Sequence, residues 1–187
     1  GASAEMFDSE KILEGYAKVA SSRKKRGHIL AQKGDADSAL QKAHRTYSAD
    51  YLSDHVYHAQ MEPLNAIVAV NPAGDGAEIW AGTQSPTGAI KEVAQLLGTS
   101  PRKIKLHPCF LGGGFGRRSM SDYIVEAAKL SKAVRKPVKL IWSREDDLQY
   151  GAFRPMCLQR LDAGVDAEGK LIAWKHSLIG DGRRLLS

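Results

Sequence analysis

The sequence predicts an α+β fold with mixed sheets, and two observations support this. A strand, a loop and a helix follow one another twice, over residues 79–98 and 104–130. Two further segments, 66–81 and 158–179, each contain β-rich stretches on either side of a turn that contains aspartate and glycine. With 187 residues, 43% of them hydrophobic, the chain is long enough to bury a core.

The first third of the chain predicts two short helices joined by a polar connection. One runs from Asp8 to about Ser22, with Asp8 or Ser9 as its N-cap, and the other begins at Asp35. The apolar residues of the first helix recur at helical spacing: Ile12, Leu13, Tyr16, Val19 and Ala20. We expect residues 1–44 to form a peripheral helical segment and linker, and residues 45–187 to form the main domain.

From residue 45 the pattern changes to strands. Residues 46–51 and 66–70 are rich in β-branched and aromatic side chains, and the segment 71–76 predicts a tight turn into a strand over 77–81. A strand over 138–142 and a final hairpin turning at 166–169 complete the expected sheets.

The two strand–loop–helix units place polar or glycine-rich loops before helices. In the first unit, Ser85 is a natural N-cap and Pro86 a natural first helical residue. In the second, the strand 104–107 leads through the loop 111–118 to a helix opened by Ser121. We expect both loops to open at helix N-termini.

Composition excludes several classes of protein. No apolar run reaches the roughly 18 residues that span a bilayer, and residues 1–8 lack the features of a signal peptide. Two cysteines, Cys109 and Cys157, cannot hold an iron–sulfur cluster. Much of the net charge of +6 lies in the run 23–26, which we interpret as a solvated helix end, although positive charge also suits a polyanion.

The glycine-rich loop is the leading candidate for a binding site. Three glycines followed by Phe115 and Gly116 give a backbone that can approach a ligand closely, and its N–H groups suit an anion or an oxo group. The alternative is a tight turn that needs glycine for its shape alone. Nucleotide-binding loops do not match, because position 117 is Arg and no Gly-Lys-Ser/Thr follows.

Other candidate residues have structural alternatives beside the functional ones. Gln84, in the first loop, could donate to a ligand oxygen or be solvated. His58 and Glu62 suggest acid–base or metal chemistry, but structural hydrogen bonding is favoured, and the spacing of the histidines does not indicate zinc. The acidic residues 145–147 are interpreted as a cap or a solvated turn.

Several segments in the same order resemble one protein family. They are His58-Ala59-Gln60-Met61-Glu62-Pro63, Gly82-Thr83-Gln84-Ser85-Pro86, Leu111-Gly112-Gly113-Gly114-Phe115-Gly116-Arg117-Arg118, Arg135-Lys136-Pro137-Val138-Lys139 and Ser143-Arg144-Glu145-Asp146-Asp147. The chain resembles the xanthine dehydrogenase and aldehyde oxidase family over roughly residues 34–181. It is most similar to the branch of isoquinoline 1-oxidoreductase beta subunits and related aldehyde dehydrogenases. The fold implied is the first molybdopterin-binding domain of a molybdenum hydroxylase large subunit.

The resemblance also implies site residues and a reaction. Gln84 and the loop residues Gly113, Gly114, Phe115 and Gly116 are expected to bind the cofactor, with no protein ligand to the metal. The reaction implied is hydroxylation of an aldehyde or a nitrogen heterocycle. Ser119 stands where xanthine-oxidising members have glutamate, which argues against a purine substrate. The catalytic residue is unknown, because the family places its glutamate base in a region without a counterpart here.

Cofactor and partners follow from the same resemblance. We expect molybdopterin, in its cytosine dinucleotide form, in a full-length protein of which this chain is a fragment that is inactive alone and possesses only part of the cofactor site. Expected partners are the remaining cofactor domain, an iron–sulfur small subunit and a small substrate, not nucleic acid, and the fragment is expected to self-associate. The resemblance favours the periplasm and leaves the cytoplasm open. The alternative function is a catalytically inert structural or polyanion-binding module.

Overall fold

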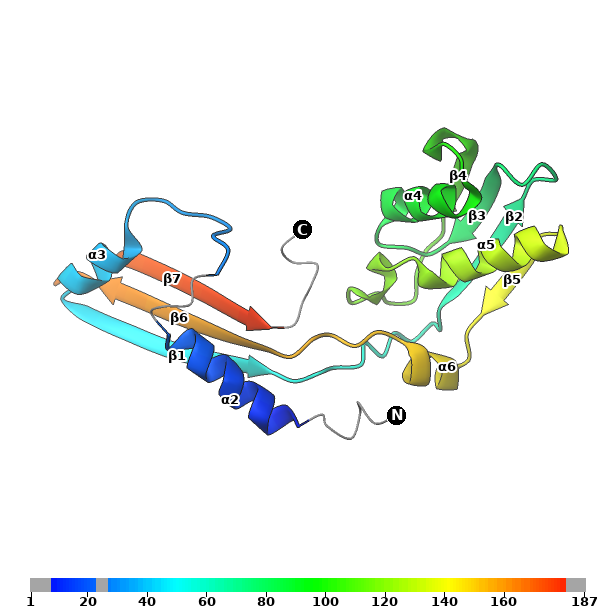
Figure 1. Ribbon diagram of the computed structural model, residues 1–187. Helices are drawn as coiled ribbons and strands as arrows, with labels where there is room; N and C mark the ends of the chain where they lie inside the picture. The colour runs from blue at the N-terminus through cyan, green and yellow to red at the C-terminus, as the bar shows by residue number, and fades with distance from the viewer. Residues whose placement is uncertain (1–7, 23–26, 181–187) are drawn as a thin grey trace. The chain divides into compact units, whose positions relative to one another are not determined.

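The structure, a computed structural model, describes residues 8–22 and 27–180 (Figure 1). The chain forms two compact units, which we name the terminal unit (Gly1–Val56 with Arg154–Ser187) and the central unit (Tyr57–Phe153). Each contains helices and its own sheet, which confirms the predicted α+β class. The predicted domain boundary at residue 44 stays a prediction.

The two predicted helices of the terminal unit are confirmed. Helix α2 (Ser9–Ala20) begins after Asp8, whose carboxylate accepts the Lys11 N–H at 3.1 Å. Helix α3 (Ala36–Lys42) begins after Asp35, which caps the Ser38 N–H at 3.0 Å. The basic run 23–26 lies outside the described residues. No helix within the described ranges is long and apolar enough to cross a membrane.

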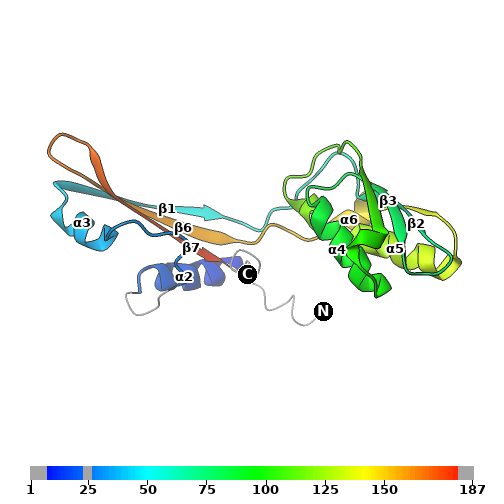
Figure 2. The same ribbon diagram turned by 90° about the horizontal axis from the view of Figure 1, so that it is seen from above.

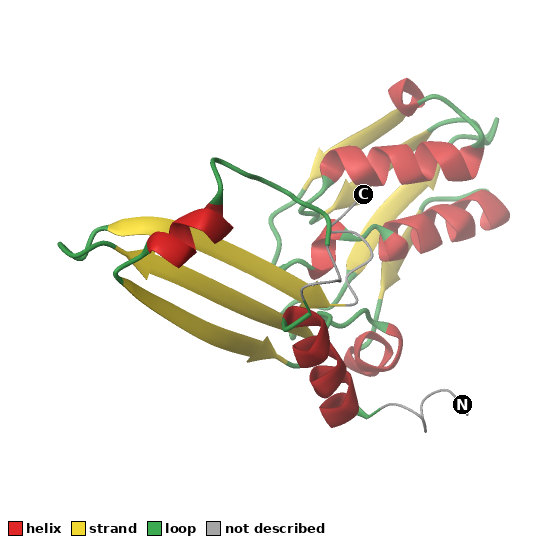
Figure 3. Ribbon diagram, turned by 60° about the vertical axis from the view of Figure 1, so that its left-hand side comes forward, coloured by secondary structure: helices red, strands yellow, loops and turns green. Residues whose placement is uncertain are grey.

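The sheet of the terminal unit is antiparallel, in the order β1-β6-β7. Its strands are β1 (Arg45–Ser53), β6 (Cys157–Val165) and β7 (Leu171–Gly180). Helices α2 and α3 lie on the same side of this sheet (Figures 2 and 3), and Tyr16, Met156 and Leu158 form its small core. The predicted turn at 166–169 is present, with the Asp166 carboxylate accepting the Lys170 N–H at 2.8 Å.

The central unit has a mixed sheet in the order β4-β3-β2-β5. Its strands are β2 (Asn65–Val70), β3 (Ala77–Ala81), β4 (Ile104–Pro108) and β5 (Val138–Ile141). Strands β3 and β4 are parallel, whereas β2 is antiparallel to both of its neighbours. The predicted turn at 71–76 is closed by Asn71, whose side-chain oxygen accepts the N–H groups of Asp75 and Gly76.

Helices α4 (Pro86–Leu97) and α5 (Asp122–Val134) bury their apolar faces against this sheet. Short 3₁₀ turns, η1 (Pro101–Lys103) and η2 (Arg117–Ser119), and helix α6 (Arg144–Tyr150) complete the unit. The core consists of alternate sheet residues and the inner faces of both helices, and includes Leu64, Val68, Ile79, Val93, Tyr123, Ile124 and Trp142.

The predicted helix starts are confirmed in position but not in their capping hydrogen bonds. A short 3₁₀ turn, η2, follows the glycine loop, and α5 begins at Asp122 with Ser121 as its N-cap, where the sequence places the helix start. Ser85 and Ser121 occupy the N-cap positions of α4 and α5, but neither side chain makes a capping hydrogen bond. The Ser85 backbone leaves the extended region that capping favours, with ψ of 69°, and its N–H donates to the Thr83 hydroxyl at 3.0 Å.

Candidate functional site

The two strand-to-helix loops lie against each other at one end of the central sheet. Because β3 and β4 are parallel neighbours, their carboxyl ends meet at the same edge. The Gly116 N–H donates to Gln84 Oε1 at 3.0 Å, and the Gln84 N–H donates to the Arg118 carbonyl at 3.0 Å. The structure therefore brings Gln84 and the glycine loop together, although the two were identified separately in the sequence.

Glycine is required in this loop for both conformation and space. Gly113 and Gly116 have φ of 94° and 99°, in the region that side chains disfavour. Gly114 is buried, and a Cβ there would lie 2.6 Å from the side-chain amide of Gln84. The loop backbone and the Gln84 amide are thus in direct contact, so the interpretation of these glycines as a turn alone does not account for Gly114.

A buried arginine ties the loop to two other segments. Arg118 is fully buried and donates to the carbonyl oxygens of Gly113 and Gly82, each at 3.1 Å. Its Nη2 donates to the Glu62 carbonyl at 2.9 Å and the Pro63 carbonyl at 3.2 Å. Because one guanidinium satisfies acceptors on three segments, Arg118 fixes the position of the glycine loop.

Glu62 supports the same arrangement through its carboxylate. Its Oε2 accepts from Arg118 and from the Gly112 N–H, both at 2.9 Å, and its Oε1 accepts from the Asn65 amide at 2.9 Å. Burial acts to raise the pKa of Glu62, but the hydrogen bonds from Gly112 and Asn65 and the charge of Arg118 lower it overall. These contacts agree with the structural interpretation of Glu62 rather than with a free base.

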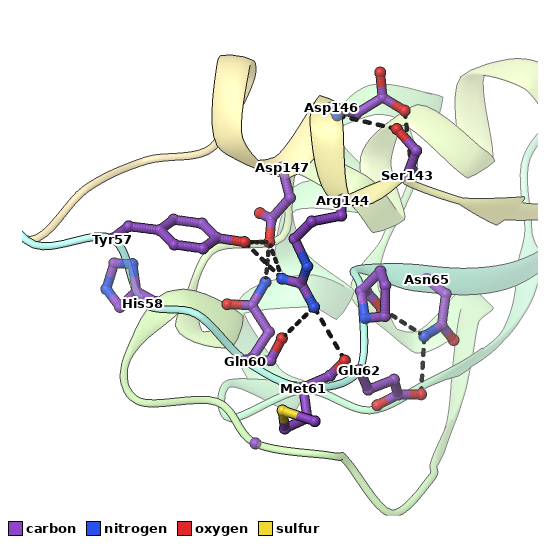
Figure 4. Close-up of polar contacts among 12 residues, drawn as sticks. Tyr57, His58, Gln60, Met61, Glu62, Asn65, Ser143, Arg144, Asp146 and Asp147 are labelled. Atoms are coloured by element: carbon purple, nitrogen blue, oxygen red, sulfur yellow. Dashed lines mark hydrogen bonds and ion pairs between the residues drawn. The ribbon is translucent and has the colours of Figure 1, made fainter.

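A buried carboxylate, that of Asp147, holds the segment that precedes Glu62 (Figure 4). Its Oδ2 accepts from the Tyr57 hydroxyl at 2.6 Å and from the Gln60 amide at 2.5 Å. Arg144 contacts Asp147 at 3.3 Å and donates to the carbonyls of Gln60 and Met61 at 2.7 and 3.0 Å. Because Asp147 binds side chains of the segment 57–61 and Arg144 binds its backbone carbonyls, the segment is held against α6.

The predicted acidic turn at residues 145–147 is therefore partly wrong. Ser143 and Asp146 form a reciprocal capping box at the start of α6, as a cap was expected. Asp147, one residue further, points inward and is fully buried instead of solvated. Helical spacing places it over Arg144, where a charge and two neutral donors compensate for the burial of its Oδ2.

His58 approaches the glycine loop, which the sequence alone did not indicate. Its Nδ1 lies 3.0 Å from the Ala152 carbonyl, which can only accept, so Nδ1 bears the proton. Its Nε2 would be 3.9 Å from a Cβ at Gly116. His58 and Gln84 thus both lie beside Gly116, and His58 is a candidate site residue in addition to a structural one.

Arg117, by contrast, is occupied in a structural pair. It is 1% exposed and donates through both terminal nitrogens to the Asp122 carboxylate, at 2.8 and 2.6 Å. Its guanidinium also lies 5.6 Å from the centre of the Trp142 ring. Burial acts to lower the pKa of Arg117, but the Asp122 carboxylate raises it overall. Both arginines that end the glycine loop are therefore buried inside the unit and present no basic surface.

Comparison with known proteins identifies the family. A family described as the molybdopterin cofactor-binding domain matches residues 21–183. The chain belongs to this family. It is 36% identical over 182 residues to the isoquinoline 1-oxidoreductase subunit beta of Brevundimonas diminuta, covering 94% of this chain and 23% of that protein. It is 35% identical over 170 residues to a membrane-bound aldehyde dehydrogenase (pyrroloquinoline-quinone) of Gluconacetobacter polyoxogenes, covering 90% of this chain and 22% of that protein.

Solved structures agree with this molybdopterin cofactor-binding domain fold. Quinoline 2-oxidoreductase from Pseudomonas putida 86 aligns with a TM-score of 0.64 at 18% identity, covering 87% of this chain and 21% of that chain. The chain thus spans less than a quarter of the length of the proteins it matches. Within the described residues of this molybdopterin cofactor-binding domain, no group of three or more His, Cys, Asp or Glu side chains is placed to hold a metal ion.

The lowered pKa of Glu62 predicts an acid-sensitive step in the stability of this cofactor-binding domain. A carboxylate whose pKa is depressed on folding stabilises the folded state fully above its unfolded pKa, and this stabilisation is lost as pH falls through the folded value. In urea denaturation, Glu62→Gln is expected to be less stable than wild type at pH 7, and the difference is expected to shrink as pH falls through that acid range. Glu145→Gln, the same change at an exposed glutamate of α6, is the control. A difference for Glu62→Gln that does not change with pH would contradict the assignment.

Proposed function

We propose that this chain forms one part of the molybdopterin site of a larger molybdenum hydroxylase that oxidises aldehydes or nitrogen heterocycles. The observation that carries the proposal is the convergence of the Gln84 amide and the Gly113–Gly116 backbone at Gly116. Two relatives are named for such substrates, an isoquinoline and an aldehyde. Ser119, at the position where xanthine-oxidising members have glutamate, supports a substrate other than a purine.

The residues around the loop fit a cofactor that offers oxygen atoms. Gln84 accepts through Oε1, which leaves its Nε2 as the atom that can donate to a bound group. Gly113 and Gly116 lack side chains, and the space at Gly116 is bordered by His58 at 3.9 Å. Gln84, Gly113, Gly114, Phe115 and Gly116 would hold the cofactor, with His58 beside them. When bound, molybdopterin would supply the molybdenum that accepts electrons from the substrate.

Further features of the whole protein are part of the same proposal. We propose the cytosine dinucleotide form of the cofactor, a remaining cofactor domain on the same polypeptide and an iron–sulfur small subunit as electron acceptor. The label "subunit beta" on the Brevundimonas relative supports a multi-subunit assembly. We also propose a periplasmic location, which cell fractionation tests. The 187-residue chain alone is expected to lack oxidase activity.

Cofactor analysis tests the proposal directly. The longest natural protein that contains this sequence would be purified and analysed for molybdenum, pterin, nucleotide and pyrroloquinoline quinone, which the Gluconacetobacter relative's name specifies. Molybdenum and pterin in comparable amounts are the expected result. Quinone without molybdenum, or neither group, would overturn the proposal and favour a different cofactor or a structural role.

A single methyl group at Gly114 is expected to disturb the site without unfolding the protein. In Gly114→Ala, the new Cβ would meet the flexible, exposed end of Gln84 at 2.6 Å, so that side chain must move and release the Gly116 N–H. We expect at least a fivefold lower molybdenum and pterin content, measured on the same longest natural protein, with an unchanged circular dichroism spectrum. Gly15→Ala, where nothing lies within 4 Å of the added methyl, is the matched control and should retain full content. Full cofactor content in Gly114→Ala would argue against a role for this contact.

A further inference from the structure

The glycine loop packs against a further segment of the central unit, residues 57–63, which we name the support segment. A Cβ added to three of the loop glycines would lie close to alternate residues of this segment: 2.7 Å from Glu62 Cβ at Gly112, 3.6 Å from Gln60 Cα at Gly113 and 3.9 Å from His58 Nε2 at Gly116. The Glu62 N–H also donates to the Gly112 carbonyl at 3.1 Å. The two stretches of backbone therefore run side by side in opposite directions, and the lack of side chains on the loop allows this approach.

The support segment contains no helix or strand, so its carbonyl groups need donors from elsewhere in the chain. Four consecutive carbonyls, those of residues 60–63, accept hydrogen bonds from two arginines. Arg144 Nη2 donates to the first two at 2.7 and 3.0 Å (Figure 4), and Arg118 Nη2 donates to the last two at 2.9 and 3.2 Å. Arg118 also binds the glycine loop directly. Within the described residues Arg144 makes no hydrogen bond to the loop, so its influence on the loop passes through the support segment.

Arg144 is itself held in place by α6 and by the start of the support segment. Its Nη1 lies 3.3 Å from Oδ2 of Asp147 and donates to the Tyr57 hydroxyl at 2.6 Å. The Asp147 carboxylate is fully buried, whereas the Arg144 side chain is 36% exposed. The charge of Arg144 thus faces Asp147, and its second terminal nitrogen is directed to the backbone carbonyls. A lysine would retain the charge but not this planar set of donors.

The backbone of Ala59 indicates how firmly the support segment is held. Its φ is 49°, in the left-handed region that residues with a Cβ rarely adopt. Such a conformation persists where the surrounding contacts determine it. On one side of Ala59, the His58 ring is bound to the Ala152 carbonyl, and on the other the carbonyl and the amide of Gln60 are both bound. These contacts maintain a bend that lets His58 and Gln60 both reach the glycine loop.

We propose that Arg144 is a positioning residue of the cofactor site, which acts from α6 through the support segment and sets the position of the glycine loop. The loop is held on one side by Gln84, at Gly114, and on the other by the support segment. A binding site requires its groups to stay within about 0.5 Å of the productive geometry, so a looser support segment weakens binding at the loop. This inference rests on the proposed function, because the loop is the part of the site that would hold molybdopterin.

The test is Arg144→Lys in the longest natural protein that contains this sequence, with Arg102→Lys, at an exposed arginine of the same unit, as the matched control. Amide hydrogen exchange is measured by mass spectrometry on the cofactor-free form of each protein, so that it reports on the loop and not on occupancy. In Arg144→Lys we expect about fivefold faster exchange in the loop 112–116 and unchanged exchange in α4, because local opening exposes the loop N–H groups. We also expect about threefold less molybdenum and pterin in the protein as purified. Arg102→Lys should match the wild type in both measurements.

The other outcomes distinguish this inference from the proposed function. Wild-type exchange in the loop of Arg144→Lys would overturn the positioning role, and so would equally faster exchange in α4, which indicates a general loss of stability. Faster exchange in the loop with full cofactor content would also overturn it, because the position of the loop would then not matter to the cofactor. A wild-type protein without molybdenum and pterin would overturn the proposed function, and this inference with it.

Discussion

Replacing Arg118 with methionine is expected to destabilise the central unit by about 3 kcal/mol, because several acceptors around its fully buried guanidinium lose their donor. The change removes the donors for the carbonyls of Gly82, Gly113, Glu62 and Pro63, and it leaves the Glu62 carboxylate without its cation. Each buried acceptor without a partner costs about 1–3 kcal/mol. Urea denaturation followed by tryptophan fluorescence would measure the loss, because Trp80 and Trp142 both lie in this unit.

Two further variants make this prediction specific. Arg102→Met makes the same change at an exposed arginine and is expected to alter stability by less than about 0.5 kcal/mol. Arg118→Lys retains the charge but lacks the planar set of donors, so a loss between those of wild type and Arg118→Met is expected. If Arg118→Met were as stable as Arg102→Met, the buried network would not contribute as described.

Replacing Asp147 with alanine is expected to cost about 3 kcal/mol, a typical value for breaking a buried ion pair. The carboxylate accepts from Tyr57 and Gln60 and neutralises Arg144, so its loss leaves the Tyr57 and Gln60 donors unpaired and removes the counter-charge of Arg144. Asp147→Asn keeps one oxygen and the shape of the side chain, and about half of this loss is expected for it. Thermal and urea denaturation of the wild type, Asp147→Asn and Asp147→Ala would rank their stabilities.

The neighbouring acidic residue is the control for Asp147. Glu145→Ala changes an exposed side chain in the same helix and is expected to shift stability by less than about 0.5 kcal/mol. Similar losses for Glu145→Ala and Asp147→Ala would indicate a general effect on α6. They would then contradict the assignment of Asp147 as the anchor of the segment 57–61.

Local signals in the sequence predicted most of the elements correctly. Asp8 and Asp35 cap helices because their carboxylates reach N–H groups three residues ahead, which spacing alone predicts. The turns at 71–76 and 166–169 also depend on neighbours within a few positions. Ser85 occupies the predicted N-cap position without a capping hydrogen bond, because its backbone, with ψ of 69°, leaves the extended region, and composition does not predict that angle.

The sequence did not predict the long-range contacts of the site. Arg118, beside a glycine loop in a chain of net charge +6, could equally have faced an anion, and its acceptors lie up to 56 positions away. Asp147 is one of three adjacent acidic residues, and only the fold distinguishes the buried one from the two exposed ones. The resemblance identified Gln84 and the glycine loop as site residues. It did not identify His58, which is held by a hydrogen bond to the Ala152 carbonyl, 94 positions away.

The pairing of β1 with β6 affects the entropy that the chain loses on folding. These strands are adjacent in the sheet, yet Ser53 and Cys157 are 104 positions apart, so pairing them closes a very long loop. When the central unit is folded, Tyr57 and Phe153 at its two ends lie with ring centres 5.9 Å apart. The long loop then behaves as a short one, and a reduction from about 100 to about 10 effective residues saves on the order of 2 kcal/mol of chain entropy. The contacts of Arg118 and Asp147 thus contribute to the stability of a sheet that neither residue belongs to.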